Sequence, residues 1–188
     1  MMNNFTSLII KRRSTRTFKE EPLLFEQVES ILKAALMAPT SKGASSWQYI
    51  VVEDRDALKQ LAACKKNGAD FLNGCSMAVV VLGDTTLDAW VEDASIASIY
   101  MQLQAEDMGV GSCWCQVRNR LTEAGQDSEE YIRSLLDIPR KFGVLSIIGF
   151  GYKVREQKPI DPSNLLWGKV HIGKFSRLDT SFVQNLQR

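Results

Sequence analysis

The chain of 188 residues contains one histidine, His171, and four cysteines, Cys64, Cys75, Cys113 and Cys115, with no C-x-x-C pair. A single histidine supports neither a histidine-rich metal site nor a Ser-His-Asp triad. The cysteines stand among apolar or small residues, which is typical of buried thiols rather than disulfides. We therefore expect no metal, and we expect any catalysis to depend on a group that the chain does not encode.

The sequence also lacks a strong net charge and a long apolar run. Its formal net charge is +1, with 24% charged and 45% hydrophobic residues, so it has no overall field that would attract nucleic acid or an anionic membrane. No apolar run reaches the roughly eighteen residues of a membrane span, and the N-terminus has no hydrophobic signal core. We expect a cytoplasmic protein built as a single domain over residues 1–188 that binds neither nucleic acid nor membrane.

Two common nucleotide-binding motifs are missing. The chain has no G-x-x-x-x-G-K-[S/T] loop. Gly149-Phe150-Gly151 follows an apolar run, but position 154 is Val and no amphipathic helix comes next, so a Rossmann site is not supported. A cysteine nucleophile at Cys113 or Cys115 stays open, although no histidine stands near either residue in the sequence.

The longest periodic stretch runs from Leu87 to Gln116. Its apolar residues recur at intervals of three or four and predict the buried stripe of an α-helix that stops at Gly109: Trp90, Ala94, Ala97, Met101, Ala105 and Met108. The opposite, polar side is expected to carry Glu92, Ser95, Gln102 and Glu106. Because that side has little charge, we expect a central helix, followed by a short strand at 113–115.

The remaining pattern indicates an α/β (α+β) chain. Helices are expected over residues 25–36, 56–61 and 129–136, with Ser128 as the cap of the last. Apolar, β-branched runs at 49–52, 78–82 and 144–150 predict strands. Strands separated by helices favour a three-layer fold, in which helices flank a mixed central sheet.

Two polar loops are candidates for a binding site. Residues 11–19 hold five cations and no acid, with hydroxyls between the cations. Such a run is commonly a solvated edge, but the apolar residues on both sides favour a partly buried loop. There Arg12, Ser14 and Arg16 could hold an anionic cofactor, since guanidinium and hydroxyl groups are suitable donors to a phosphate monoester. The small polar residues from Pro39 to Trp47 form either a simple helix-to-strand connector or part of the same site.

Four motifs resemble those of the flavin-dependent nitroreductase family and occur in the family's order. Arg12-Arg13-Ser14-Thr15-Arg16 resembles R-R-S-x-R, and residues 38–47 look like A-P-S/T-S-x-N-x-Q-P-W. Residues 109–114 are similar to G-L-G-x-C-W, and residues 148–152 to I-G-x-G-Y. Together the motifs cover the chain from about residue 8 to 160. The chain departs from the pattern at Gly43, Ser45 and Ser46, where the family has Asn, Gln and Pro.

The resemblance implies a nitroreductase-like fold, an intertwined homodimer and bound FMN. It places four residues at the phosphate, ribityl chain and pyrimidine edge of FMN: Arg12, Arg13, Ser14 and Arg16. The other subunit would supply Pro39, Thr40, Ser41 and Gly43, while Trp114 and Gln116 would border the ring, with the Gln116 backbone N–H near flavin N5. One more cation is expected at the phosphate, from among Lys153, Arg155, Lys158, Lys169 and Lys174. The large apolar groups of residues 153–188 need cover, so this C-terminal extension is expected to lie on the partner subunit.

The resemblance further implies an NAD(P)H-dependent FMN oxidoreductase that reduces nitroaromatic compounds, quinones or similar small-molecule oxidants by a ping-pong hydride mechanism. The chemistry would be that of the flavin, with Arg16 polarising its N1 and O2 edge, and no side chain is expected to be catalytic. Two other interpretations stay open. One is a flavin-binding or sensory module without turnover, and the other is a reductive dehalogenase of the same fold. Because Gly43 and Ser45 replace the family's Asn and Gln, the hydrogen bonds of those two side chains near the flavin would be lost.

Overall fold

The computed structural model describes residues 4–175. Residues 1–3 and 176–188, which include the end of the expected C-terminal extension, lie outside the described part. The helices are α1 (Phe5–Lys11), α2 (Phe25–Leu36), α3 (Arg55–Ala62), α4 (Trp90–Asp107) and α5 (Ser128–Leu135). The strands are β1 (Trp47–Val52), β2 (Met77–Asp84), β3 (Val110–Gln116) and β4 (Phe142–Tyr152). Every helix and strand expected from the sequence is confirmed, with ends that shift by a few residues.

The four strands form one sheet in the order β1-β2-β4-β3, and each neighbouring pair is antiparallel. The expectation of a mixed sheet is therefore wrong for these strands. Helix α4 does cross over between two strands of the same direction, β2 and β3, but β4 lies between them and pairs with both. Within residues 4–175, the only parallel pairing is an isolated bridge between Ser14 and Ser112.

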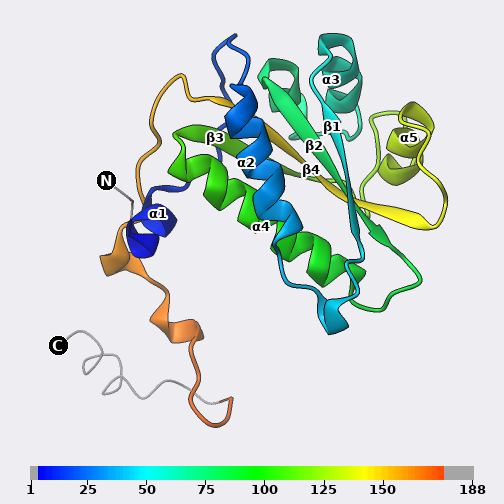
Figure 1. Cartoon of the computed structure of the whole chain (residues 1–188). Helices are drawn as coiled ribbons and strands as arrows, with labels where there is room; N and C mark the ends of the chain where they lie inside the picture. The colour runs from blue at the N-terminus through cyan, green and yellow to red at the C-terminus, as the bar shows by residue number, and fades with distance from the viewer. Residues whose placement is uncertain (1–3, 176–188) are drawn as a thin grey trace.

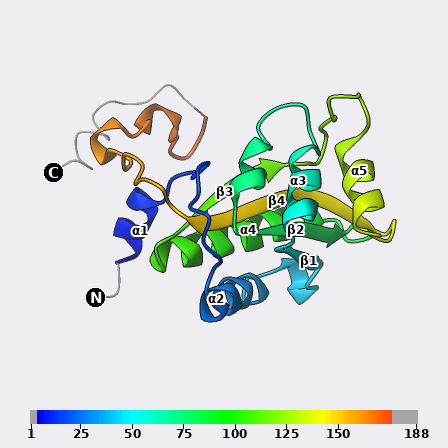
Figure 2. The same cartoon turned by 90° about the horizontal axis from the view of Figure 1, so that it is seen from above.

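Helices cover both faces of the sheet, as the three-layer expectation requires (Figure 2). Alternate residues of β2 point to opposite faces. Val79 and Val81 pack with Ile31 of α2 and Met101 of α4 in one core. On the other face, Val80 belongs to a second core that also contains residues of α3 and α5. The helix pair α2 and α4 thus lies opposite the pair α3 and α5.

Helix α4 runs along the sheet beneath α2 and is the longest helix of the described chain (Figure 1). Its predicted apolar stripe is confirmed, since Ala94, Ala97, Met101 and Ala105 are fully buried. The assignment of Gln102 and Glu106 to the outer side is wrong, because both are buried, and Asp93 is buried with them. The outer side instead exposes apolar groups, among them Ile96, Ile99 and Tyr100.

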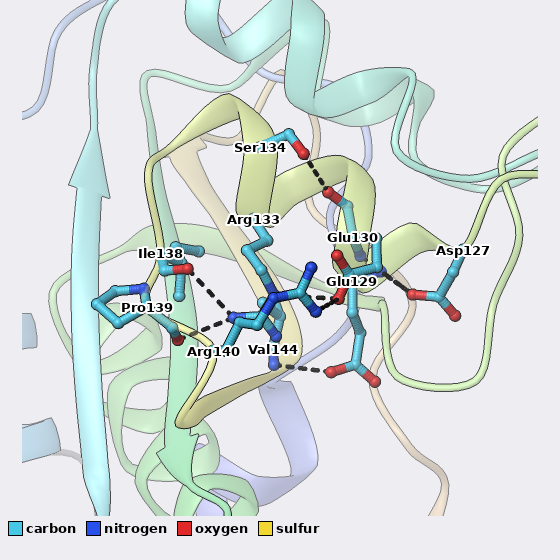
Figure 3. Close-up of polar contacts among 9 residues, drawn as sticks. All are labelled: Asp127, Glu129, Glu130, Arg133, Ser134, Ile138, Pro139, Arg140 and Val144. Carbon is cyan, nitrogen blue, oxygen red and sulfur yellow. Dashed lines mark hydrogen bonds and ion pairs between the residues drawn. The ribbon is translucent and has the colours of Figure 1, made fainter.

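Helix α5 is fixed to the start of β4 by polar contacts (Figure 3). Its cap is Asp127, whose carboxylate accepts the backbone N–H groups of Glu129 and Glu130. The prediction of Ser128 as the cap is therefore wrong. Ser128 is the first helical residue, and its hydroxyl is buried without a partner among the described residues. The Glu129 carboxylate accepts the Val144 N–H at 3.0 Å, and Arg133 donates to the carbonyls of residues 138 and 139.

Within residues 4–175, each helix is too short or too polar to pass through a lipid bilayer.

Candidate functional site

The first candidate loop lines a small cavity of about 370 Å³. Its walls are Arg12, Arg13, Ser14, Arg16, Gln157 and Lys158. No acidic residue is among them, and none of the four cations forms an ion pair with another residue of the described chain. Four uncompensated cations, a hydroxyl and an amide form a donor set that fits a phosphate monoester.

The sheet holds this loop in place through backbone contacts. The Thr15 N–H donates to the Ser112 carbonyl on β3 at 2.9 Å, and the Lys19 N–H donates to the Tyr152 carbonyl at the end of β4 at 2.9 Å. Phe18 is buried between these two bonds and lies against Gly151. This loop, residues 11–19, is called the basic loop below. It follows the edge of the sheet and is partly buried, which confirms the expectation of a partly buried loop.

Glycine at position 111 is required by the close approach of the basic loop. A Cβ atom there would lie 2.8 Å from the Thr15 hydroxyl and 2.8 Å from Cγ of Lys153. Thr15 is 2% exposed, and its hydroxyl has no hydrogen-bond partner among the described residues. This packing gives a structural reason for the second glycine of the G-L-G-like segment.

Of the five candidate cations of the C-terminal segment, Lys158 lies in the wall of this cavity. Lys158 lines the cavity together with the three arginines, whereas Arg155, Lys169 and Lys174 do not. Lys153 is engaged elsewhere, since its ammonium lies 2.7 Å from the Glu106 carboxylate, with both side chains buried. Lys158 is therefore the cation that this chain places beside Arg12 and Arg16.

Trp114 and Gln116 lie further along the same edge strand. Residues 112, 114 and 116 alternate along β3 and share one face. The indole N–H of Trp114 donates to Oε1 of Gln116 at 3.0 Å, and Nε2 of Gln116 donates to the Arg118 carbonyl at 3.1 Å. The structure thus brings the basic loop, Trp114 and Gln116 to one edge of the sheet.

The second candidate loop is held by a buried carboxylate. Asp93, in the first turn of α4 and 3% exposed, accepts the Ser41 N–H at 2.8 Å and the Ser46 hydroxyl at 2.7 Å. Lys42 and Ser45 both have positive φ values, 55° and 49°, which residues other than glycine rarely adopt. Ser46 thus uses its hydroxyl to fix the loop, a bond that a proline at this position could not make.

The two loops lie at opposite ends of α4 within one chain. Asp93 holds the loop that contains Pro39, Thr40, Ser41 and Gly43, and Glu106 contacts the segment beside the basic loop. Thirteen residues separate the two acids, which corresponds to about 20 Å along a helix. The structure therefore does not bring the predicted residues of the two loops together in one protomer.

The cysteine alternative finds no support. All four cysteines are free thiols and buried, as expected from the sequence. Burial raises the pKa of the Cys113 thiol, and the nearby charge of Arg16 only partly opposes that shift. A hydrogen bond from Cys64 lowers the pKa of Cys115, but Cys115 is 0% exposed and cannot meet a substrate.

Three buried polar residues that contact the candidate site from α4 were missed from the sequence. Asp93, Gln102 and Glu106 all contact segments of the site from α4, and Gln102 does so by donating to the Ser112 hydroxyl at 3.3 Å. A signal was present, because residues 98, 102 and 106 are spaced by four and border the apolar stripe. Polar side chains next to a helix stripe that is otherwise made of alanine and methionine indicate buried contacts rather than a solvated side.

The model of the nitroreductase family matches residues 9–76 and 63–152 of this chain. The structure resembles that of an FMN-dependent nitroreductase from Clostridium difficile R20291, with 43% sequence identity and a TM-score of 0.88 over 91% of this chain and 100% of that one. A protein of Archaeoglobus fulgidus with the provisional name NADH dehydrogenase/NAD(P)H nitroreductase is 34% identical over 83% of this chain and 89% of its own length. The FMN reductase (NADPH) of Bacillus subtilis is 26% identical over 64% of this chain and 57% of its own length.

The match to the family model spans most of the chain and contains both loops and the edge strand described above. Its boundaries enclose the basic loop, the Ser41–Ser46 loop that Asp93 holds, and all of β3 and β4. The chain therefore belongs to the nitroreductase family of oxidoreductases.

Proposed function

We propose that this protein is an FMN-dependent oxidoreductase that uses NAD(P)H to reduce nitroaromatic compounds, quinones or similar small oxidants. The observation that carries the proposal is the cavity at the sheet edge, where Arg12, Arg13, Arg16 and Lys158 face one another without an acid. The names of the relatives, which include an NAD(P)H nitroreductase and an FMN reductase (NADPH), support the same cofactor and the same reductant.

The chain's own groups would bind and polarise the cofactor. Arg12, Arg13, Ser14 and Lys158 would hold the phosphate, and Trp114 and Gln116 would border the ring from β3. Bound FMN supplies the hydride and two-electron chemistry that the side chains lack. Arg16, which lies near Cys113 on β3, would place a positive charge beside the pyrimidine edge and stabilise negative charge there.

A second copy of the chain would complete the site. In one protomer the loop with Pro39, Thr40, Ser41 and Gly43 is about 20 Å from the phosphate end, measured along α4, so the partner's loop is the one proposed to reach the ring. An apolar surface supports a dimer, because α1, α2 with its C-cap Met37, and α4 together expose large side chains: Phe5, Phe25, Leu36, Met37, Ile99 and Tyr100. The segment after residue 153 exposes Leu166 and Phe175, which fits the proposed packing of this extension on the partner.

The absorbance spectrum of the purified protein tests the cofactor. A yellow protein with flavin bands that bleach under nitrogen on addition of NADH or NADPH, and recover with a nitroaromatic compound or a quinone, is the expected result. Bound flavin that does not bleach would identify a binding or sensory module instead. Release of halide from a halogenated aromatic, without reduction of quinones, would identify a reductive dehalogenase. Failure to take up FMN at all would overturn the proposal.

Arg16→Ala tests the role of the cation at the site. Because a charge-assisted contact is lost, FMN affinity or turnover should fall by about tenfold or more. The matched control is Arg155→Ala, which removes an exposed cation of the same type that does not line the cavity. Unchanged flavin content and turnover in the Arg16 variant would refute its role.

Met37→Glu tests the proposed dimer. Met37 is 71% exposed on the apolar surface, so a carboxylate there should be desolvated by dimer formation and should shift the protein towards a monomer. Light scattering at micromolar concentration measures the mass. Leu121→Glu is the control, because Leu121 is a similarly exposed apolar residue that lies outside α1, α2 and α4. A monomeric wild-type protein would contradict the dimer.

A further inference from the structure

Glu106 and Lys153 form a buried ion pair that the proposed chemistry does not use. Lys153 Nζ lies 2.7 Å from Glu106 Oε1, and the two side chains are 8% and 6% exposed. The ammonium also lies 3.2 Å from a carboxylate oxygen of Glu156, which is largely exposed. Burying two charges costs solvation, so such a pair adds little net stability compared with an apolar pair. In some proteins, buried polar pairs of this kind fix one arrangement of the groups that they join.

Lys153 lies where the basic loop, β3 and the end of α4 meet, next to the cavity proposed to bind the phosphate. Its backbone forms an isolated bridge with Phe18, at the end of the basic loop. Its Cγ atom and the Thr15 side chain both lie against Gly111, so the stem of the Lys153 side chain packs on β3 at the place where the basic loop also meets this strand. Its ammonium then reaches the last turn of α4 at Glu106. One side chain thus joins α4, β3 and the loop that carries the arginines.

Lys153 also contacts the segment that leads to Lys158. Residues 154–159 have no helix or strand. The Val154 N–H donates to the Thr17 carbonyl at 3.4 Å, and the Ile160 N–H donates to the Ile10 carbonyl at 3.0 Å. Between these two bonds, the contact of Glu156 with Lys153 is the only polar side-chain contact that the segment makes within residues 4–175. Gln157 and Lys158 follow Glu156 directly and line the cavity.

We propose that Glu106 and Lys153 are positioning residues for the phosphate end of the cofactor site. The pair holds residues 153–158 against the basic loop, so that Lys158 and Gln157 face Arg12 and Arg16 across the cavity. Neither side chain of the pair lines that cavity. The inference rests on the proposed FMN function and adds to it the residues that set the phosphate subsite.

A comparison of FMN with riboflavin tests this role, because riboflavin carries the same ring without the phosphate. Lys153→Met keeps the stem and removes the charge, and the double variant Glu106→Gln/Lys153→Met also removes the acid, so that no charge is left buried alone. Affinities are measured by quenching of flavin fluorescence. Both variants should bind FMN about tenfold more weakly, while riboflavin affinity changes less than about twofold. Lys153→Arg, which keeps the charge, should recover most of the FMN affinity.

Arg133→Met is the matched control. Arg133 is a half-buried cation, 13% exposed, that is also paired with an acid, at 3.2 Å from Glu130, but it lies on α5. This variant should lower thermal stability without changing the ratio of FMN to riboflavin affinity.

Equal losses for the two flavins in the Lys153 variants, or no loss in the double variant, would overturn the positioning role. If Lys153→Met does not fold, the double variant alone decides. Failure of the wild-type protein to bind FMN would refute the proposed function itself, which is a different outcome.

Discussion

The two ends of α4 differ in how their buried acids contact the rest of the chain. At the N-terminal end, the Asp93 carboxylate accepts bonds from two uncharged donors of the Ser41–Ser46 loop. At the C-terminal end, the Glu106 carboxylate faces the Lys153 ammonium. Both acids are buried, on a helix whose apolar stripe consists of alanine and methionine. The comparison shows that one helix can use two kinds of buried acid, one that accepts neutral hydrogen bonds at its start and one that forms a charge pair at its end.

The difference predicts how each end responds to mutation. A buried charge that loses its partner keeps its full solvation cost, whereas removal of both charges avoids that cost. A carboxylate that accepts from neutral groups has no charged partner to leave behind. We therefore expect a strong coupling between two positions at the Glu106 end and a simpler loss at the Asp93 end.

The largest effect is expected at the charge pair. Lys153→Met should lower the free energy of unfolding by about 3–5 kcal/mol, because Glu106 remains buried without its cation. The double variant Glu106→Gln/Lys153→Met should recover most of that loss. The coupling energy between positions 106 and 153 is measured by urea unfolding of the wild-type protein, Lys153→Met, Glu106→Gln and the double variant. Additive losses would show that the two ends of α4 do not differ in the proposed way.

Asp93→Ala is expected to have the next largest effect, about 2–3 kcal/mol, because it leaves the Ser41 N–H and the Ser46 hydroxyl without their acceptor. Ser46→Ala removes only one of these bonds and should cost about 1 kcal/mol.

The same Asp93 variant sharpens the comparison of the two ends. If the Ser41–Ser46 loop contacts the ring, Asp93→Ala should weaken FMN and riboflavin binding equally, unlike Lys153→Met. A selective loss of FMN affinity in the Asp93 variant would contradict the assignment of this loop to the ring.

The smallest effect concerns a third acid, Glu129, on the opposite face of the sheet (Figure 3). Burial raises the pKa of Glu129 above its ordinary value, although its carboxylate accepts the Val144 N–H. The folded protein therefore holds the proton more readily than the unfolded chain, and the contribution of Glu129 to stability decreases as pH rises through the window above about 4.3.

Glu129→Gln removes this titration and keeps an oxygen for Val144. Relative to the wild-type protein, the variant should gain stability as pH rises from about 4 to 7, by less than about 1 kcal/mol once solvent screening is considered. Unfolding curves at several pH values measure the trend. If the variant instead loses stability relative to the wild-type protein as pH rises, hydrogen bonding outweighs burial in setting the pKa of Glu129.

Local sequence rules accounted for most of the fold. The stripe of α4 and the apolar runs of β2 and β4 were predictable because their periodicity depends only on which residues face a core. The antiparallel sheet was not, because strand order depends on which strands pair after the helices have packed. The cap of α5 was misplaced by one residue, since Asp127 and Ser128 are both good caps and only the tertiary contacts decide between them.

The site divides in the same way. The sequence by itself determined the basic loop, the motif at residues 109–114 and the family, because short motifs carry these features. Only the tertiary structure decided that Lys158 faces the arginines and that Asp93 and Glu106 are buried. The physical reason is that a charged residue on a helix is ordinarily solvated, and its burial is favoured only when distant segments of the chain bring partners to it.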